Sequence, residues 1–325
     1  MDTQQIFEIQ SDKQFNDNCL SIFRYQYDHC QTYKQYVDYL RIDTKDISHY
    51  TQIPFLPIEL FKSQEIITSG SVPKVTFSSS GTTGMITSKH LVADAKLYEQ
   101  SFRKAFEQFY GDVRDIAVLA LLPSYLERSG SSLIYMVDDL IKSSEQPESG
   151  YFLYNHSDLF TALQKLKQKN TKTILFGVTY ALLDFVETYE IDFPELIIME
   201  TGGMKGKRKE MIREEVHDLL RDGFNVPAIH SEYGMTELLS QGYSYGKGIF
   251  QHPNWMKILI RDTNDPLTLT DNSRTGAINV IDLANIYSCS FIATQDLGKI
   301  YPDGSFEVLG RFDQSDIRGC NLLVQ

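Results

Sequence analysis

Phe77-Ser-Ser-Ser-Gly-Thr-Thr-Gly84 directly follows a strand-like run, Val72–Phe77, and is the stretch from which the fold can be worked out. Glycines permit positive φ and close backbone approach, and a row of hydroxyl groups supplies hydrogen-bond donors for polyphosphate oxygens. Such a loop suits ATP. Taken alone, a Ser/Gly run is more often a plain flexible turn. It is not a Walker A loop, because no Gly-Lys-Ser/Thr follows the glycines.

A second candidate segment is Ser231-Glu-Tyr-Gly-Met-Thr-Glu237, which lies where a predicted strand ends. An aromatic ring can stack on a purine, a threonine hydroxyl can contact a phosphate, and a carboxylate can hold Mg²⁺ against phosphate oxygens. In isolation the segment would be interpreted as a turn or a helix N-cap with a surface glutamate. Both segments therefore need support from the rest of the chain.

Apolar runs alternate with amphipathic helices in the middle of the chain. The predicted strands are Ile116–Leu122, Thr173–Val178, Leu196–Glu200 and Val226–Ser231. Helices are predicted where apolar residues share one face, namely Tyr98, Phe102, Phe106 and Phe109; Leu159, Leu163 and Leu166; and Ile212, Val216, Leu219 and Leu220. We expect the last helix to end at Gly223 as its C′ glycine. The alternation predicts parallel βαβ units and hence an α/β domain.

Two further regions flank this core. From about Asp12 to Leu60, aromatic and aliphatic residues recur near helical spacing, which predicts a helical N-terminal segment. After Asn254 the pattern changes to short β-rich pieces, which predict a smaller subdomain built from hairpins: Met256–Arg261, Ala277–Leu283, Ser288–Thr294 and Phe306–Leu309. The expected organisation is a helical segment at 1–60, an α/β core at 61–253, and a β-rich subdomain with a C-terminal tail at 254–325.

The whole chain has 325 residues, of which 31 are basic and 43 acidic, with a net charge of −12. This balance argues against nucleic acid and anionic membrane surfaces as partners. The start lacks the basic patch and apolar core of a signal peptide, and no stretch approaches the ~18 apolar residues of a membrane span. The cysteines lie far apart with no CxxC pair, so neither a zinc knuckle nor a disulfide framework is expected. We expect a cytoplasmic protein.

Six short segments follow one another along the chain: Ser79-Ser-Gly-Thr-Thr-Gly84, Gly177-Val-Thr179, Thr201-Gly-Gly203, Tyr233-Gly-Met-Thr-Glu237, Thr294-Gln-Asp-Leu-Gly298 and Leu309-Gly-Arg-Phe-Asp313. Each is common alone, but the ordered set is specific. In this order they resemble the phosphate-loop, carboxylate-pocket, adenine, adenine–phosphate–metal, ribose and hinge motifs of the adenylate-forming enzymes. This superfamily includes acyl-CoA synthetases, nonribosomal-peptide adenylation domains and luciferases.

Four further stretches narrow the resemblance: Leu122-Pro-Ser-Tyr-Leu-Glu-Arg128, Gly130-Ser-Ser132, Ser231-Glu-Tyr-Gly-Met-Thr-Glu-Leu-Leu-Ser-Gln241 and Ile317-Arg-Gly-Cys320. With them the chain most resembles the acyl-protein synthetases of the bacterial luminescence type, which load a fatty acyl group onto protein. The likeness covers nearly the whole chain from about Pro54. The resemblance implies the large N-terminal-type α/β domain of adenylate-forming enzymes, with parallel βαβ units and a smaller β-rich subdomain. The superfamily's C-terminal lid domain is expected to be absent, since the sequence ends at Gln325.

The resemblance also implies ligands and site residues. The substrates would be ATP, with Mg²⁺, and a carboxylic acid, for which the resemblance implies a long-chain fatty acid. Glu237 would hold Mg²⁺, Thr236 would contact the α-phosphate, and Asp296 with Arg311 would bind the ribose. Further nucleotide contacts are implied for Gly202, Gly203, Tyr233 and Gly234 around the adenine and for Ser79, Ser80, Gly81, Thr82, Thr83 and Gly84 at the phosphates.

Cys320 matches, by position and context, the cysteine that holds the acyl group as a thioester in acyl-protein synthetases. An acyl reductase or acyltransferase protein could then exchange acyl groups with it. Without the resemblance, a lone cysteine is more often a small buried hydrophobe than a nucleophile. Cys289 is expected in the core, and Cys19 and Cys30 in the N-terminal helices.

Two features depart from the superfamily pattern. A lysine usually follows the second glycine of the phosphate loop closely, whereas here Met85-Ile-Thr-Ser precedes Lys89. The lid domain that we expect to be absent would also carry a catalytic lysine. Two alternatives stay open: a ligase whose acceptor is the thiol of coenzyme A or of a carrier protein, and a non-catalytic subunit that binds nucleotide.

Overall fold

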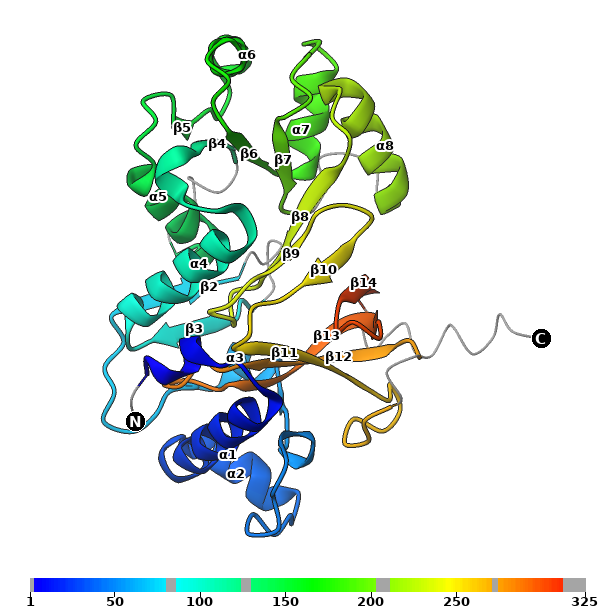
Figure 1. The fold of residues 1–325 in the computed structure, drawn as a ribbon. Coiled ribbons are helices and arrows are strands. Elements are labelled where there is room, and N and C mark those ends of the chain that lie inside the picture. The colour runs from blue at the N-terminus through cyan, green and yellow to red at the C-terminus, as the bar shows by residue number, and fades with distance from the viewer. Residues whose placement is uncertain (1–2, 80–85, 124–129, 203–210, 271–273, 312–325) are drawn as a thin grey trace, which may run out of the picture. The chain divides into compact units, whose positions relative to one another are not determined.

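A computed structural model describes residues 3–79, 86–123, 130–202, 211–270 and 274–311 of the chain (Figure 1). The helices are α1 (Asp12–His29), α2 (Gln31–Tyr39), α3 (Leu60–Ser63), α4 (Ala95–Tyr110), α5 (Ser132–Ser143), α6 (His156–Gln168), α7 (Thr179–Val186) and α8 (Arg213–Phe224). The strands are β1 (Leu56–Pro57), β2 (Val75–Ser78), β3 (Lys89–Val92), β4 (Ala117–Leu121), β5 (Gly150–Tyr151), β6 (Thr173–Gly177), β7 (Ile197–Glu200), β8 (Ile229–Tyr233), β9 (Gly242–Ser244), β10 (Ile249–Gln251), β11 (Met256–Arg261), β12 (Gly276–Asp282), β13 (Phe291–Ile300) and β14 (Phe306–Arg311).

The chain forms two compact units. Unit 1 comprises Met1–Ser101, Thr236–Ser240 and Gln251–Gln325, and unit 2 comprises Phe102–Met235 and Gln241–Phe250. The organisation into 1–60, 61–253 and 254–325 stays a prediction. No helix in the described part of the chain is long and apolar enough to cross a membrane.

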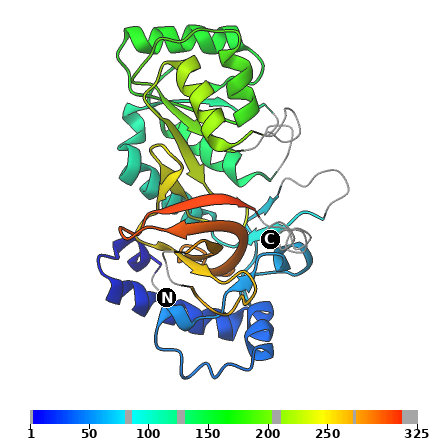
Figure 2. The same ribbon diagram turned by 90° about the vertical axis from the view of Figure 1, so that its right-hand side faces the viewer.

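Unit 2 contains a largely parallel sheet with the strand order β9-β8-β7-β6-β4-β5. Every pair from β8 to β5 is parallel, and only β9 runs antiparallel to β8. Figures 1 and 2 show α5 on one face of these strands and α7 with α8 on the other. Because both faces are covered, β4 and β6 consist of buried residues from end to end. The predicted α/β class with parallel βαβ units is therefore confirmed.

Helix α8 shows where the sequence-based prediction was wrong. The left-handed residue that ends the helix is Asn225, with φ of 50°, and Gly223 lies inside the last turn. A Cβ at Gly223 would lie 2.5 Å from the Cβ of Val186, so this glycine lets α7 approach closely. Two positions assigned to the buried face are exposed, Ile212 at 62% and Leu219 at 50%. The buried face consists of Val216, Leu220 and Phe224.

Unit 1 contains an antiparallel meander in the order β11-β12-β13-β14, as the β-rich pattern predicts. The short strand β1 pairs in parallel with β13, and β2 pairs with β3 as a separate two-stranded sheet. In Figures 1 and 2, α1 and α2 lie along one side of the meander. Gln26 of α1 fixes this packing, since its buried amide donates to the carbonyls of Asn285 and Ile286 at 2.9 Å.

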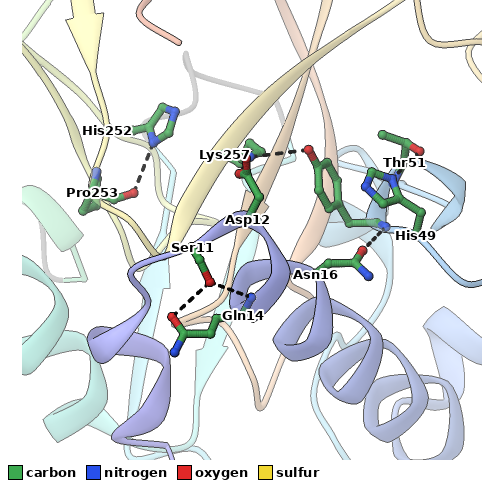
Figure 3. Close-up of polar contacts among 10 residues, drawn as sticks. Ser11, Asp12, Gln14, Asn16, His49, Thr51, His252, Pro253 and Lys257 are labelled. Carbon is green, nitrogen blue, oxygen red and sulfur yellow. Dashed lines mark hydrogen bonds and ion pairs between the residues drawn. The ribbon is translucent and has the colours of Figure 1, made fainter. Parts of the chain in front are cut away.

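The start of α1 is held by its own sequence and by β11. The hydroxyl of Ser11 accepts a hydrogen bond from the amide of Gln14 at 3.3 Å and so caps the first turn (Figure 3). Lys257 of β11 lies 3.0 Å from the Asp12 carboxylate, and its ammonium group also lies over the ring of Phe15. The N-terminal helical segment is thus an integral part of unit 1.

Gly298 provides a test of packing in the meander. Its Cβ position would lie 2.3 Å from the carbonyl oxygen of Glu307 and 2.6 Å from Cδ1 of Ile278, at a point where the β13–β14 register shifts. We expect Gly298→Ala to lower the free energy of unfolding by about 1–3 kcal/mol, because backbone must move. Gly150→Ala is the matched control, since nothing lies within 4 Å of its Cβ position. Denaturant unfolding of both variants checks this, and equal stabilities would contradict it.

Candidate functional site

The segment Thr236–Ser240 is anchored in unit 1 by one buried carboxylate. Oδ2 of Asp282, at the end of β12, accepts hydrogen bonds from the amides of Leu239 at 2.6 Å and Ser240 at 3.0 Å. Oδ1 accepts from the Ser240 hydroxyl at 2.5 Å and from the Ala284 amide at 3.2 Å. Asp282 has no exposed surface, and burial raises the pKa of its carboxyl while these donors oppose the rise. Asp282 therefore fixes the Leu239–Ser240 end of the segment that carries the predicted site residues Thr236 and Glu237.

Two side chains hold the carbonyl groups of the same segment. Nδ1 of His90, on β3, lies 2.8 Å from the carbonyl oxygen of Thr236. Nδ2 of Asn285 donates to the carbonyl oxygen of Glu237, also at 2.8 Å. Both side chains are buried, at 0% and 1% exposure. Neither His90 nor Asn285 was predicted from the sequence.

The carboxyl group of Glu237 meets the start of the predicted phosphate loop through Ser88. Burial raises the pKa of Glu237, and a hydrogen bond from the Ser88 hydroxyl and the positive charges of Arg311 and Lys62 oppose this rise. The amide of Ser88 donates to Oγ of Ser79 at 2.9 Å, and the amide of Ser79 donates to the Ser88 carbonyl at 3.1 Å. The first described residue of the loop and the predicted metal ligand thus share one partner.

The strand that follows the loop presents different residues on its two faces. Side chains alternate along a strand, and Ser88 and His90 are buried whereas Lys89 between them is exposed. Lys89 therefore lies on the opposite face from the residues that contact Thr236 and Glu237. For Ser88, closeness to the loop in the sequence was the one available signal, and no sequence signal indicated His90 or Asn285.

Asp296 and Arg311, the predicted ribose residues, are brought together as directly opposed positions of β13 and β14. The amide of Asp296 donates to Oγ1 of Thr294 at 3.1 Å. Arg261, which is buried at 6% exposure, donates to the Thr294 carbonyl at 2.5 Å. This buried guanidinium group fixes the backbone just before Asp296.

In unit 2, the carboxyl group of Glu200 links the predicted carboxylate-pocket and adenine motifs. Its Oε1 accepts hydrogen bonds from the hydroxyl of Thr179 and, at 2.9 Å, from the amide of Gly202. The amide of Thr201 donates to the carbonyl of Gly177 at 3.0 Å. Gly202 has φ of 85°, a conformation that favours glycine, and its Cβ position is open. Burial raises the pKa of Glu200.

Strand β8, which pairs with β7, ends at Tyr233 in the second predicted motif, Ser231–Glu237. The ring of Tyr233 is 8% exposed and meets Phe250 edge-on, with centroids 6.0 Å apart. Oε1 of Glu232 lies 2.2 Å from where a Cβ of Gly234 would be, so the missing side chain leaves room for this carboxyl group. Burial and the charge of Glu200 raise the pKa of Glu232 to about 7. Neither Glu232 nor Glu200 was predicted from the sequence to be a group with a shifted pKa.

Several predicted residues lie outside the described part of the chain, namely Ser80, Gly81, Thr82, Thr83, Gly84, Gly203 and Cys320. Cys289 is buried as expected, and Cys19 and Cys30 are buried as well. Burial raises the pKa of each of these three thiols, so none is a thiolate at neutral pH. In the described ranges no group of three or more His, Cys, Asp and Glu side chains could hold a metal ion. Glu237 as a single carboxylate still fits Mg²⁺, which keeps waters and relies on substrate phosphates.

Known proteins resemble the chain in sequence and in fold. A family model described as acyl-protein synthetase, LuxE, matches residues 3–325. No curated protein matches the chain. An open-conformation structure of 2-hydroxyisobutyryl-CoA ligase with 2-HIB-AMP and CoA has a TM-score of 0.65 and 11% identity, covering 93% of this chain and 70% of the ligase.

ATP-bound MatB from Rhodopseudomonas palustris has a TM-score of 0.54 and 15% identity, covering 73% of this chain and 47% of MatB. A chimera of this enzyme, RpMatB-BxBclM B3, gives similar values, with a TM-score of 0.55 and 16% identity. This chain thus spans about half the length of the MatB-type proteins, since the match covers 47% of the chimera as well. At these identities the likeness shows a shared fold.

The pKa of Glu232 predicts a dependence of stability on pH. Between about pH 4.5, the ordinary value, and about pH 7, the unfolded chain has released this proton while the folded protein keeps it. The free energy of unfolding therefore falls as pH rises through this window, by on the order of 3 kcal/mol. We expect Glu232→Gln to flatten the dependence and to be more stable than the wild type at pH 8.

Chemical denaturation from pH 3 to pH 8 measures this effect. Asp262→Asn is the control with the opposite sign, because the amides of Asn264 and Asp265 lower the pKa of the Asp262 carboxyl. Its contribution is lost as pH falls, below the window of Glu232. A Glu232→Gln variant with the wild-type slope between pH 5 and pH 7 would rule out the buried proton.

Proposed function

The chain belongs to the acyl-protein synthetase family, LuxE, and on this premise we propose that it activates a carboxylic acid with ATP and passes the acyl group to a protein thiol. The observation that carries the first step is the connection of Ser79 and Glu237 through Ser88. It supports a joint role for the predicted phosphate loop and a carboxylate that we propose as the Mg²⁺ ligand. The acid is proposed to be a long-chain fatty acid, and the reaction to take place in the cytoplasm.

In the first step, an oxygen of the substrate carboxylate attacks the α-phosphorus of ATP. A new P–O bond forms, the bond to the β-phosphate oxygen breaks, and pyrophosphate leaves with its electron pair. Thr236 would contact the α-phosphate, and Ser79 to Gly84 would bind the departing phosphates. Glu237 would hold Mg²⁺, which neutralises phosphate charge when bound. The chain's own contribution is to position the reactants, which can lower a barrier substantially.

The remaining nucleotide contacts are assigned by the same reasoning. Asp296 and Arg311 would bind the ribose, and their pairing across β13 and β14 supports a joint role. Gly202, Gly203, Tyr233 and Gly234 would surround the adenine. The positive φ of Gly202 supports a tight backbone approach there.

In the second step, a thiolate attacks the acyl carbonyl carbon, a C–S bond forms, the bond from this carbon to the phosphate oxygen breaks, and AMP leaves with the electron pair. We propose Cys320 as this thiol, with an acyl reductase or acyltransferase protein taking the acyl group from it. Cys19, Cys30 and Cys289 are buried with raised thiol pKa values, which supports a different cysteine as the acceptor.

An external thiol is the second candidate acceptor. The similar 2-hydroxyisobutyryl-CoA ligase was solved with an acyl adenylate and CoA, and its fold covers most of this chain. In that case Cys320 would be structural and coenzyme A or a carrier protein would take the acyl group. A nucleotide-binding subunit without activity is the remaining alternative, to be distinguished by the exchange assay below.

The first step is tested by exchange of labelled pyrophosphate into ATP with a panel of fatty acids. We expect acid-dependent exchange by the wild type and a loss of about 100-fold in Glu237→Gln, because the metal would lose a charged ligand. No exchange by the wild type with any acid, with or without candidate partner proteins, would favour the inactive subunit.

The acceptor is tested by intact mass after incubation with ATP and the active acid. A hydroxylamine-sensitive acyl adduct that Cys320→Ser abolishes, while pyrophosphate exchange continues, supports self-acylation. Cys19→Ala is the control and should keep the adduct, since its thiol is buried. An adduct that survives in Cys320→Ser would assign the acceptor elsewhere, and product formation only with added coenzyme A would favour the external thiol.

A further inference from the structure

His90 and Asn285 form a closed chain of contacts with the two backbone carbonyls of Thr236 and Glu237. His90 Nδ1 faces the Thr236 oxygen at 2.8 Å, and Asn285 Nδ2 donates to the Glu237 oxygen at 2.8 Å. The remaining atoms of the two side chains, His90 Nε2 and Asn285 Oδ1, lie 3.0 Å apart. The orientation of two successive peptide groups thus depends on one imidazole ring and one amide.

The hydrogen-bond roles in this chain follow from the number of donors. Burial lowers the pKa of His90 to about 4, so the ring is neutral and carries a single proton. The Asn285 amide cannot turn over, because its oxygen would then face the Glu237 oxygen. The neutral ring therefore faces two acceptors and can satisfy only one of them. With the proton on Nδ1, the ring holds Thr236; with the proton on Nε2, it holds Asn285.

The same face of the chain around β3 also reaches the side chain of Glu237. Ser88 and His90 are two residues apart and both are buried, and the Ser88 hydroxyl opposes the rise that burial causes in the pKa of the Glu237 carboxyl. One short stretch therefore acts on both the backbone and the carboxyl group of the segment. Asp282 holds the amides of Leu239 and Ser240 further along.

We propose that His90 is a positioning residue, which fixes the Thr236 carbonyl through Nδ1 so that the Thr236 hydroxyl and the Glu237 carboxylate keep the places that a metal-bound nucleotide needs. This inference rests on the proposed adenylation. His90 touches neither substrate nor metal in this role. Because a displacement of about 1 Å at reacting groups can lower a rate about 100-fold, losing this contact should reduce kcat strongly.

Two amide substitutions separate the ring's two contacts. The amide nitrogen of asparagine is as many bonds from Cβ as Nδ1 of histidine, and that of glutamine as many as Nε2. His90→Asn can therefore keep the bond to Thr236, whereas His90→Gln can keep only the contact with Asn285. We expect acid-dependent pyrophosphate exchange within about 3-fold of the wild type for His90→Asn and about 10- to 100-fold lower in kcat for His90→Gln. The apparent Mg²⁺ requirement should rise in His90→Gln, and KM for the acid should stay unchanged.

A control separates positioning from general destabilisation. Val37→Ala removes buried volume from α2 in unit 1 without touching the segment, so it should lower stability and leave exchange per folded molecule unchanged. Equal activities of His90→Asn and His90→Gln, or a loss that tracks stability as in Val37→Ala, would overturn the proposal.

Amide hydrogen exchange keeps this test independent of the proposed reaction. Peptides that contain Thr236–Ser240 should exchange faster in His90→Gln than in His90→Asn if the Thr236 contact orders the segment. No pyrophosphate exchange by the wild type would contradict the proposed adenylation alone, whereas equal hydrogen exchange in the two variants would contradict the role of His90.

Discussion

The buried carboxylate of Asp282 is the constraint on which the candidate site depends. A carboxylate taken out of water is costly unless donors surround it, and four donors from Leu239, Ser240 and Ala284 do so here. Satisfying this one group fixes the path of the chain from Thr236 to Ser240. The contacts of His90, Asn285 and Ser88 then act on a segment that is already in place, so small side chains are enough to orient its carbonyls and its carboxylate.

Much of the fold could be predicted because its strands differ in pattern. Buried parallel strands such as β4 and β6 are continuous apolar runs, and the end residues of β11 coincide with those of the predicted Met256–Arg261. Helix α8 was harder, because Gly223 serves close packing against Val186 and not termination, a distinction that depends on a residue far away in sequence. Helices α5 and α7 were not predicted at all. Most of α7 is buried, so it lacks the polar face that reveals a surface helix.

The candidate site could be predicted only where a single stretch carries the chemistry. Ser79 and Glu237 belong to short stretches whose residue types suggest their roles, whereas the roles of Asp296 and Arg311 were predicted only from the resemblance of their motifs to those of adenylate-forming enzymes. The side chains that orient the Thr236–Glu237 backbone come from distant parts of the sequence, since His90 lies 146 residues before its partner Thr236 and 195 before Asn285. Nor can spacing along the chain reveal that Glu200 raises the proton affinity of Glu232. That property arises from neighbouring strands of a parallel sheet and from burial.

Because the three described thiols are buried, their reaction with a thiol reagent can report on opening of the folded protein. Cys19 and Cys30 lie in and just after α1, and Cys289 lies close to the start of β13, all within unit 1 and nearly or fully inaccessible. A thiol reagent can reach them only when this part of the protein opens, so their alkylation rates measure local opening from the native state. The protein thus carries built-in reporters that distinguish loosening of the α1 packing from global unfolding, without any engineered label.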